Sequence, residues 1–266
     1  MAIARKPLAL LSVTGLIALV GGCADEGRGI QSGASPSPTK ATEATTPPAA
    51  LGCDNLPLST EAYMGSPESP VLSASGGKVS AQANIFGAGF GAPPAPGGGG
   101  GGLLPPVFDL PSGTSRVVTF PSVTGRVTHF VAEGQWNGPE GDGIGKIDVK
   151  SLRGIAGIFH RTNKSFLVGL FLTDADPLSG APPRLDFSET ELTKPDTTFV
   201  GPFDRLAPEI GQVFLIGDGK GKTYDVPDEA TRLFLGFADA MLWEGCPGWY
   251  GNNRGKVNVT IEVKAG

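Results

Sequence analysis

Short runs of apolar residues, separated by turn residues, dominate the C-terminal 150 residues of the chain. In the last run a valine or isoleucine occupies every second position between Lys256 and Val263, the period of a half-buried strand. No stretch of a dozen residues has an apolar stripe at helical spacing. The pattern therefore predicts an all-β fold, an antiparallel β-sandwich or jelly roll. The predicted strands cover Lys78–Phe86, Arg116–Phe120, Arg126–Val131, Lys146–Val149, Phe166–Leu172, Gln212–Ile216, Arg232–Phe237 and Lys256–Val263.

The N-terminus has the pattern of an export signal. Two basic residues precede an apolar run from Leu8 to Val20, which as a helix would span about 20 Å, against roughly 30 Å for a bilayer core. The run therefore fits a signal peptide better than a membrane span. It ends in Val20-Gly21-Gly22-Cys23, which resembles the lipobox of bacterial lipoproteins. The resemblance implies a signal peptide over residues 1–22, and a lipid on Cys23 that anchors the protein in a bilayer of the cell envelope.

The residue after the cysteine bears on which membrane this is. Ala24 stands where retention in the inner membrane favours aspartate, so we expect the outer membrane if the cell has one. The alternative is a soluble secreted protein with an incidental cysteine.

Composition divides the rest of the chain into a tether and a domain. Residues 23–52 are rich in Ser, Thr and Pro and contain few large apolar residues, so we expect a disordered tether. Residues 53–266 have the composition of a core-forming domain, and we assign the predicted β-sandwich to them. A Pro/Gly-rich segment interrupts them at residues 87–106, where six consecutive glycines (97–102) predict a flexible loop.

Charge and cysteine content exclude several classes of protein. Lys and Arg number 21 against 26 Asp and Glu, a net charge of −5, so we expect no nucleic-acid partner. Two histidines and three cysteines exclude a His-rich or Cys-rich metal cluster. With Cys23 lipidated, Cys53 and Cys246 remain in an oxidising compartment, either as a disulfide or as two separate buried thiols.

The segment before the last strand contains a candidate calcium site. Asp239 follows an apolar run, and a Gly-rich loop beginning at Cys246 ends in Asn252 and Asn253. Calcium prefers six to eight oxygen ligands, which carboxylates, amides and carbonyls provide. Asn-Asn and Gly clusters are also common in turns, so this pattern leaves open both a calcium site and a plain hairpin loop.

The same residues resemble the PA-I-type galactophilic lectins, which are small bacterial calcium-dependent galactose-binding β-sandwiches. The resemblance rests on Leu233–Asp239, on Pro247-Gly-Trp-Tyr-Gly-Asn-Asn-Arg-Gly255 and on the alternating last strand. It implies that calcium is the cofactor, bound by the side chains of Asp239, Asn252 and Asn253 and by the carbonyl of Trp249.

The resemblance extends to two earlier segments. Gly134–Asp142 is similar to the turn that supplies a further calcium-binding carbonyl, here from Trp136 or Asn137. His160-Arg-Thr-Asn163 matches the family's sugar-contacting His-x-x-Gln. The implied sugar ligands are then His160, Asn163, Asp239 and Asn252, with Trp243, Trp249 or Tyr250 covering an apolar sugar face. This chain has six additional residues, Ala240–Gly245, between Asp239 and the Pro-Gly turn.

Nothing in the sequence points to an enzyme. Gly217–Thr223 looks like a phosphate loop, but Ile216 stands in place of the first glycine, so we interpret the segment as a hairpin turn. The motifs of zinc proteases and serine hydrolases are missing. We therefore expect calcium-dependent binding of a galactose-like carbohydrate at the bacterial cell surface or envelope. The alternative is a structural or adhesive envelope lipoprotein whose calcium-stiffened loop binds no sugar.

Overall fold

The computed structural model describes residues 53–56, 65–129, 135–177, 180–191 and 194–266, all within a compact unit that covers Pro48–Gly266. The predicted signal peptide, the lipidation site Cys23 and the tether at 23–52 lie outside the described residues. Over the described ranges the chain forms strands and short 3₁₀ turns and no α-helix, which confirms the all-β prediction. None of these residues forms a helix long and apolar enough to cross a membrane.

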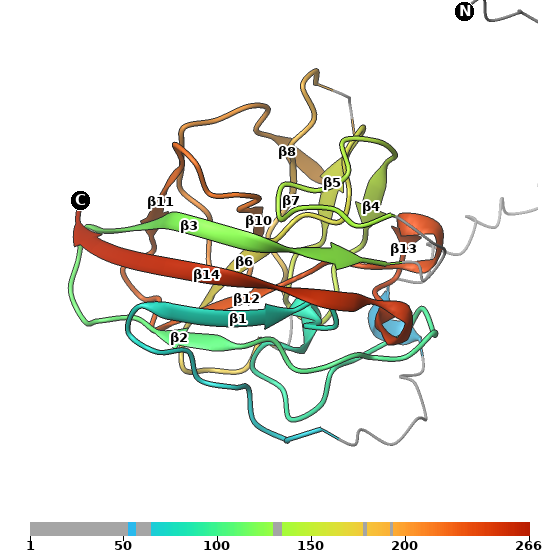
Figure 1. Ribbon diagram of the computed structural model, residues 1–266, viewed down its shortest axis with the longest axis horizontal. Coiled ribbons are helices and arrows are strands. Elements are labelled where there is room, and N and C mark those ends of the chain that lie inside the picture. The colour runs from blue at the N-terminus through green and yellow to red at the C-terminus, as the bar shows by residue number, and fades with distance from the viewer. Residues whose placement is uncertain (1–52, 57–64, 130–134, 178–179, 192–193) are drawn as a thin grey trace, which may run out of the picture. The chain divides into compact units, whose positions relative to one another are not determined.

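The strands of the described residues form three sheets (Figure 1). The first has the order β1 (Gly76–Ser80), β14 (Arg254–Ala265), β3 (Arg116–Thr128), β11 (Thr223–Val226) and β9 (Arg205–Leu206). The second has the order β10 (Val213–Leu215), β6 (Val168–Leu172), β12 (Arg232–Gly236) and β2 (Val107–Asp109). The third has the order β13 (Glu244–Gly245), β4 (Ile147–Val149), β5 (Ile158–His160), β7 (Arg184–Asp186) and β8 (Thr197–Phe199).

Most neighbouring strands in these sheets are antiparallel. The second sheet is antiparallel throughout, and the first departs from this only where β11 pairs with the short β9. In the third sheet β4 and β5 are antiparallel, whereas the other three pairs are parallel. Some strands pair with partners that are far apart in the sequence, as β13 does with β4.

The long ribbon of β3 and β14 shows the alternation expected from the sequence. Val257, Val259 and Ile261 are buried, and Lys256 and Glu262 are exposed. The register shifts between Thr260 and Glu262, so that two β3 residues, one of them Pro121, lie opposite one residue of β14. Proline has no N–H to donate, and a bulge tolerates that loss.

Aromatic side chains connect the sheets in one core. Tyr224 of β11 packs against Phe120 of β3 and against Phe214 of β10, with ring centroids 5.5 and 4.9 Å apart. Every residue of β6 is buried. A strand covered on both faces reads as a continuous apolar run without alternation, which explains its Val-Gly-Leu-Phe-Leu sequence.

Three predicted elements differ from the structure. The strand predicted over Lys78–Phe86 ends at Ser80, because the Asn84 side chain accepts from the Phe86 N–H and begins a 3₁₀ turn, η2 (Ile85–Gly87). The two runs predicted between Arg116 and Val131 are one strand as far as Thr128. Residues 217–223 connect β10 to β11 in another sheet, so the segment is not a hairpin.

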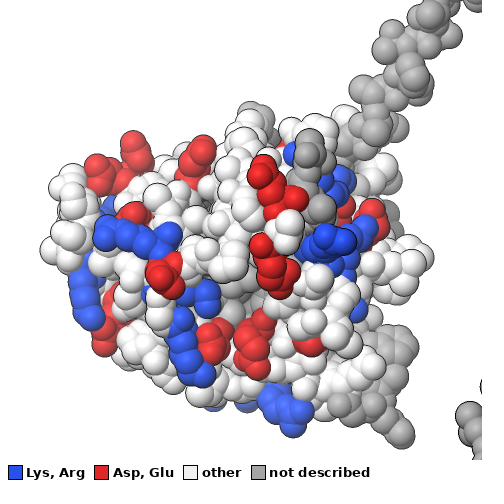
Figure 2. All heavy atoms as spheres, turned by 90° about the horizontal axis from the view of Figure 1, so that it is seen from above, with Lys and Arg blue, Asp and Glu red and all other residues white. Residues whose placement is uncertain are grey.

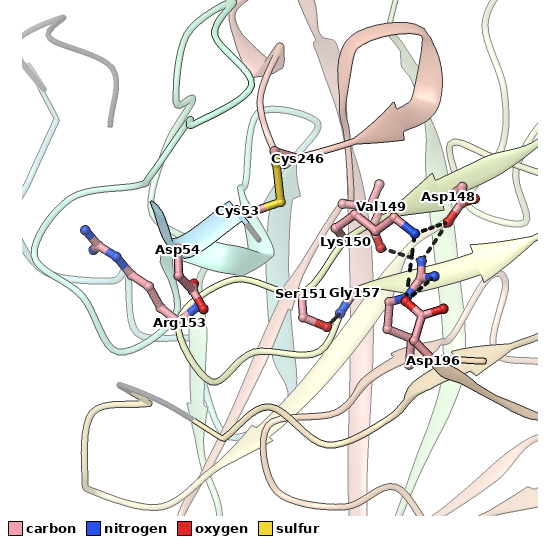
Figure 3. Close-up of a disulfide and its surroundings, with 11 residues drawn as sticks. Cys53, Asp54, Asp148, Val149, Lys150, Ser151, Arg153, Gly157, Asp196 and Cys246 are labelled. Atoms are coloured by element: carbon pink, nitrogen blue, oxygen red, sulfur yellow. Dashed lines mark hydrogen bonds and ion pairs between the residues drawn. A yellow bond between two sulfur atoms is a disulfide. The ribbon is translucent and has the colours of Figure 1, made fainter. Parts of the chain in front are cut away.

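A disulfide between Cys53 and Cys246 confirms that these two cysteines are paired; their Cα atoms are 5.5 Å apart (Figure 3). It joins the short turn η1 (Cys53–Asn55) to the residue that follows β13. The Asp54 carboxylate also accepts a 2.6 Å hydrogen bond from the Arg153 N–H. The start of the described domain is therefore held at two points near the third sheet.

Candidate functional site

A cavity of about 350 Å³ opens where β3 and β12 end. It is lined by Thr128, His129, Gln135, Asn137, Asp142, Lys164, Ser165, Asp239, Ala240, Met241, Leu242, Trp243, Trp249 and Asn252. The lining combines carboxylates, amides and hydroxyls with two indoles. Convergent polar groups within a partly apolar wall are typical of small-molecule sites.

Asp239 is the most buried carboxylate of this cavity, with 3% of its surface exposed. One carboxylate oxygen, Oδ1, accepts from the Ala240 N–H at 2.8 Å, and Oδ2 lies 3.7 Å from Nδ1 of His129. Burial raises the pKa of Asp239, and the contacts with His129, Asn253 and the Ala240 N–H offset part of that rise. The site thus contains a desolvated acid that a bound cation would neutralise.

The loop after Cys246 carries two asparagines whose buried side-chain oxygens have no hydrogen-bond partner. Asn253 is fully buried; its Nδ2 donates to the Ala81 carbonyl at 3.1 Å, which leaves Oδ1 without a hydrogen-bond partner. The Oδ1 atom of Asn252 is likewise buried and unpartnered, and this residue lines the cavity with Asp239. Buried acceptors in native proteins are nearly always satisfied by a protein group, a water or an ion, so these two oxygens are available to a bound cation.

This donor set fits calcium better than a transition metal. One carboxylate and two amide oxygens are hard ligands, which suit calcium. Among the described residues no group of three or more His, Cys, Asp or Glu side chains could hold a metal ion, so imidazole or thiolate sites have no support there. The candidate calcium ligands are therefore Asp239, Asn252 and Asn253, of which Asp239 and Asn252 line the cavity.

Tyr250, in the 3₁₀ turn η4 (Tyr250–Asn252), joins this loop to the backbone around Asp239 through its side chain. Its hydroxyl donates to the Phe237 carbonyl at 2.9 Å and accepts from the Asp239 N–H at 3.0 Å. The Asp239 carbonyl accepts from the Gly248 N–H at 3.0 Å. Tyr250 is fully buried, so among the three aromatics considered for contact with a sugar only Trp243 and Trp249 line the cavity.

The glycine run forms the second support of this loop. Gly98 and Gly100 accept from the N–H groups of Trp249 and Tyr250, and Gly97 accepts from the indole N–H of Trp249 at 3.1 Å. This differs from the expectation of a flexible loop. Glycines here permit backbone to approach backbone, a use of glycine that composition does not distinguish from flexibility.

The two candidates for a further calcium-binding carbonyl have different positions. The Trp136 carbonyl accepts from the guanidinium of Arg126 at 2.9 Å, and Trp136 is not among the lining residues. Asn137 lines the cavity, but its carbonyl accepts from the Val127 N–H at 2.9 Å. Both carbonyls therefore already have a partner in the structure.

The predicted sugar ligands His160 and Asn163 are not among the residues that line the cavity. His160 is buried against Phe166, and its Nδ1 accepts from the Thr162 N–H at 3.3 Å. Asn163 uses its side chain to bind the turn at Glu140 to Gly143. Of the four predicted sugar ligands, Asp239 and Asn252 line the cavity, and His160 and Asn163 do not.

Sequence reasoning missed the contribution of the inserted residues 240–245. The 3₁₀ turn η3 (Met241–Trp243) lies in this insertion and lines the cavity. Leu242 and Trp243 have φ values of 51° and 66°, and Trp249 and Ser165 are also left-handed. Four of the six non-glycine residues with positive φ in the described chain thus line this one cavity. Such strained residues cluster at functional sites. The presence of these six additional residues was the sequence feature that could have indicated their part in the cavity.

Charged side chains near the cavity are paired. Lys164 lies 3.8 Å from an Asp142 carboxylate oxygen and 4.8 Å from the centroid of the Trp243 ring. On the face in Figure 2, basic and acidic side chains alternate without a continuous patch of either sign. That face gives no extended cationic surface to a polyanion.

No protein-family model matches this chain, and no curated protein matches its sequence. The case for a function therefore rests on the cavity and the residues around it.

Proposed function

We propose that this protein binds a galactose-like carbohydrate in a calcium-dependent manner, as a lipoprotein at the surface or envelope of a bacterial cell. In this proposal residues 1–22 are a signal peptide, Cys23 carries the lipid anchor and residues 23–52 are a disordered tether. The anchor lies in the outer membrane if the cell has one. Residues 53–266 form an antiparallel β-sandwich or jelly roll of the PA-I galactophilic lectin type.

The observation that carries the proposal is that the buried carboxylate of Asp239 and the unpartnered amide oxygen of Asn252 belong to residues that line the same cavity. Asp239, Asn252 and Asn253 are the residues that the lectin-like motif assigns to calcium, and the first two line the cavity. The oxygens of Asn252 and Asn253 have no other partner. Bound calcium would neutralise the carboxylate and offer coordination positions to two neighbouring hydroxyls of a sugar.

The chain's own residues would orient the sugar. The Asp239 carboxylate and the Asn252 amide can hydrogen-bond the same hydroxyls, because both face the cavity. Trp243, Trp249 and the half-exposed Met241 provide apolar surface for the C–H face of a sugar ring. A carbohydrate fits these groups because it combines hydroxyls with an apolar ring face.

Calcium binding is tested by thermal unfolding in calcium and in EDTA. We expect calcium at a hundredfold excess over its Kd to raise the Tm by about 5 to 10 °C. Asp239→Asn should abolish this shift. Asp225→Asn, which removes an exposed ion pair with Arg205, is the matched control and should keep it.

Sugar binding is tested on a glycan array with and without EDTA. Retention of galactose-terminated glycans that EDTA removes supports the proposal. Binding that is unaffected by EDTA contradicts calcium dependence. A calcium shift in Tm without sugar retention instead indicates a structural or adhesive lipoprotein whose loop is stiffened by calcium.

A further inference from the structure

His129 presents two unsatisfied polar atoms in the cavity wall. It follows the last residue of β3, lines the cavity with Asp239 and has 6% of its surface exposed. Neither Nδ1 nor Nε2 has a hydrogen-bond partner in the structure. The nearest charged atom is Oδ2 of Asp239 at 3.7 Å, beyond hydrogen-bond length. A buried polar group left without its hydrogen bond is costly and rare in native proteins, so this arrangement requires an explanation.

Packing fixes the orientation of this imidazole. The ring meets Trp243 edge to face, with centroids 4.8 Å apart, and meets Phe237 at 5.8 Å. Trp243 belongs to the inserted turn and has a left-handed backbone. The aromatic contacts therefore hold His129 against the cavity, although they supply no hydrogen bond.

The other histidine provides a direct contrast. His160 is buried to the same extent, with 6% exposed, but its Nδ1 accepts from the Thr162 N–H and it does not line the cavity. Burial lowers the pKa of His160, and the nearby Glu189 and Asp186 offset part of that effect. His160 has the properties of a structural histidine, whereas His129 has unused hydrogen-bonding capacity at a cavity.

The chemistry of a hydroxyl matches this capacity. A neutral imidazole has one donor and one acceptor, and a hydroxyl can serve as partner to either. The only lysine or arginine among the described lining residues, Lys164, already lies beside Asp142, so no unpaired basic side chain of the lining is left for the carboxylate of an acidic sugar. We propose that His129 is a ligand-binding residue whose imidazole hydrogen-bonds hydroxyls of a neutral sugar. This inference rests on the carbohydrate-binding function proposed above.

The test measures galactose affinity in calcium by titration calorimetry for the full chain and three variants. We expect His129→Phe, which keeps an aromatic ring and removes both nitrogens, to weaken binding about ten- to a hundredfold. His129→Gln retains one donor and one acceptor and should recover part of the loss. His160→Phe is the matched control and should stay within about twofold of the wild type.

Two readouts separate the possible failures. The calcium shift in Tm shows whether each variant is folded with its calcium site intact, and His129→Gln covers the case in which His129→Phe does not fold. Wild-type affinity in both His129 variants overturns the inference while the proposed function stands. An equal loss in His160→Phe also overturns it. A wild-type protein that binds no galactose overturns the proposed function and this inference together.

Discussion

Gly99 lies directly against the indole of Trp249: a Cβ atom at this glycine would stand 2.5 Å from the Trp249 side chain. Atoms at that distance overlap, so any side chain at residue 99 must displace the indole or the loop that carries it. Trp249 lines the cavity and precedes the two asparagines of the candidate calcium site. A side chain at residue 99 would therefore disturb the loop that carries the candidate calcium site.

Gly99→Ala should disrupt the site, and Gly98→Ala is its matched control. Both glycines have left-handed backbones, with φ of 69° and 80°, so each alanine costs about 1 to 2 kcal/mol in backbone strain. A Cβ at Gly98 meets nothing within 4 Å. We expect Gly99→Ala to lower the free energy of unfolding by about 2 kcal/mol more than Gly98→Ala, and to weaken calcium binding. Equal unfolding midpoints in urea would contradict the steric argument.

These glycines show where sequence reasoning ends. The alternation at Val257 and Val259 predicts a strand, because burial on one face of a sheet is a local property of the sequence. The six glycines predict flexibility from composition, and their actual role depends on the 246–251 loop, which is remote in sequence. The lining position of His129 is non-local in the same way, since it is set by contacts with Phe237 and Trp243.

The motif at the end of the chain was more informative because its residues are close in sequence. Asp239, Asn252 and Asn253 lie within one short stretch of the chain, which also contains η3, β13 and η4, so few assumptions were needed to group them in one candidate site. His160 was assigned by the match of His160-Arg-Thr-Asn163 to a short family motif, which fixes its position along the chain and leaves its direction open. The structure places it beside Phe166, and it is not among the residues that line the cavity.

Loss of the disulfide should destabilise the domain. Cys53 and Cys246 close a loop with a sequence separation of 193 residues, for which the chain-entropy model gives about 5 kcal/mol. We expect the Cys53→Ser, Cys246→Ser double variant to unfold at lower urea, and the wild type to match it in reducing agent. If the wild type unfolds at the same urea concentration with and without reducing agent, the bridge contributes nothing to stability.

Leu242→Gly should stabilise the protein slightly. Leu242 is 85% exposed and has a φ of 51°, a conformation that glycine adopts without strain. Relief of this strain exceeds the entropy that glycine adds to the unfolded chain, so we expect a gain of about 0.5 to 1 kcal/mol. Met241→Gly is the control, because Met241 has no positive φ and should gain nothing. A loss of stability in Leu242→Gly would show that its side chain packs in the native state.

A buried ion network in the third sheet surrounds Asp148. Its carboxylate contacts Arg184 at 2.7 Å and Lys194 at 2.5 Å, and Arg184 also contacts Asp196 (Figure 3 shows the two aspartates). Asp148 and Arg184 are almost fully buried. Burial alone would raise the pKa of Asp148, but Lys194 and Arg184 outweigh it and lower the pKa below the ordinary value of 3.8.

This pKa shift predicts an acid-sensitive contribution to stability. Because the folded-state pKa is depressed, the contribution is present above the ordinary value of 3.8 and is lost as the pH falls through the lower folded-state pKa. Asp148→Asn leaves Arg184 without its buried counter-charge and should destabilise the protein by about 3 to 5 kcal/mol at neutral pH. The difference in unfolding free energy between the wild type and Asp148→Asn should then shrink as the pH falls below 3.8. The control is Asp225→Asn, which removes an exposed ion pair and should change the unfolding free energy by no more than about 1 kcal/mol. Urea unfolding between neutral and acidic pH measures these free energies. If the difference between the wild type and Asp148→Asn stays constant across that range, Asp148 does not titrate as its surroundings require.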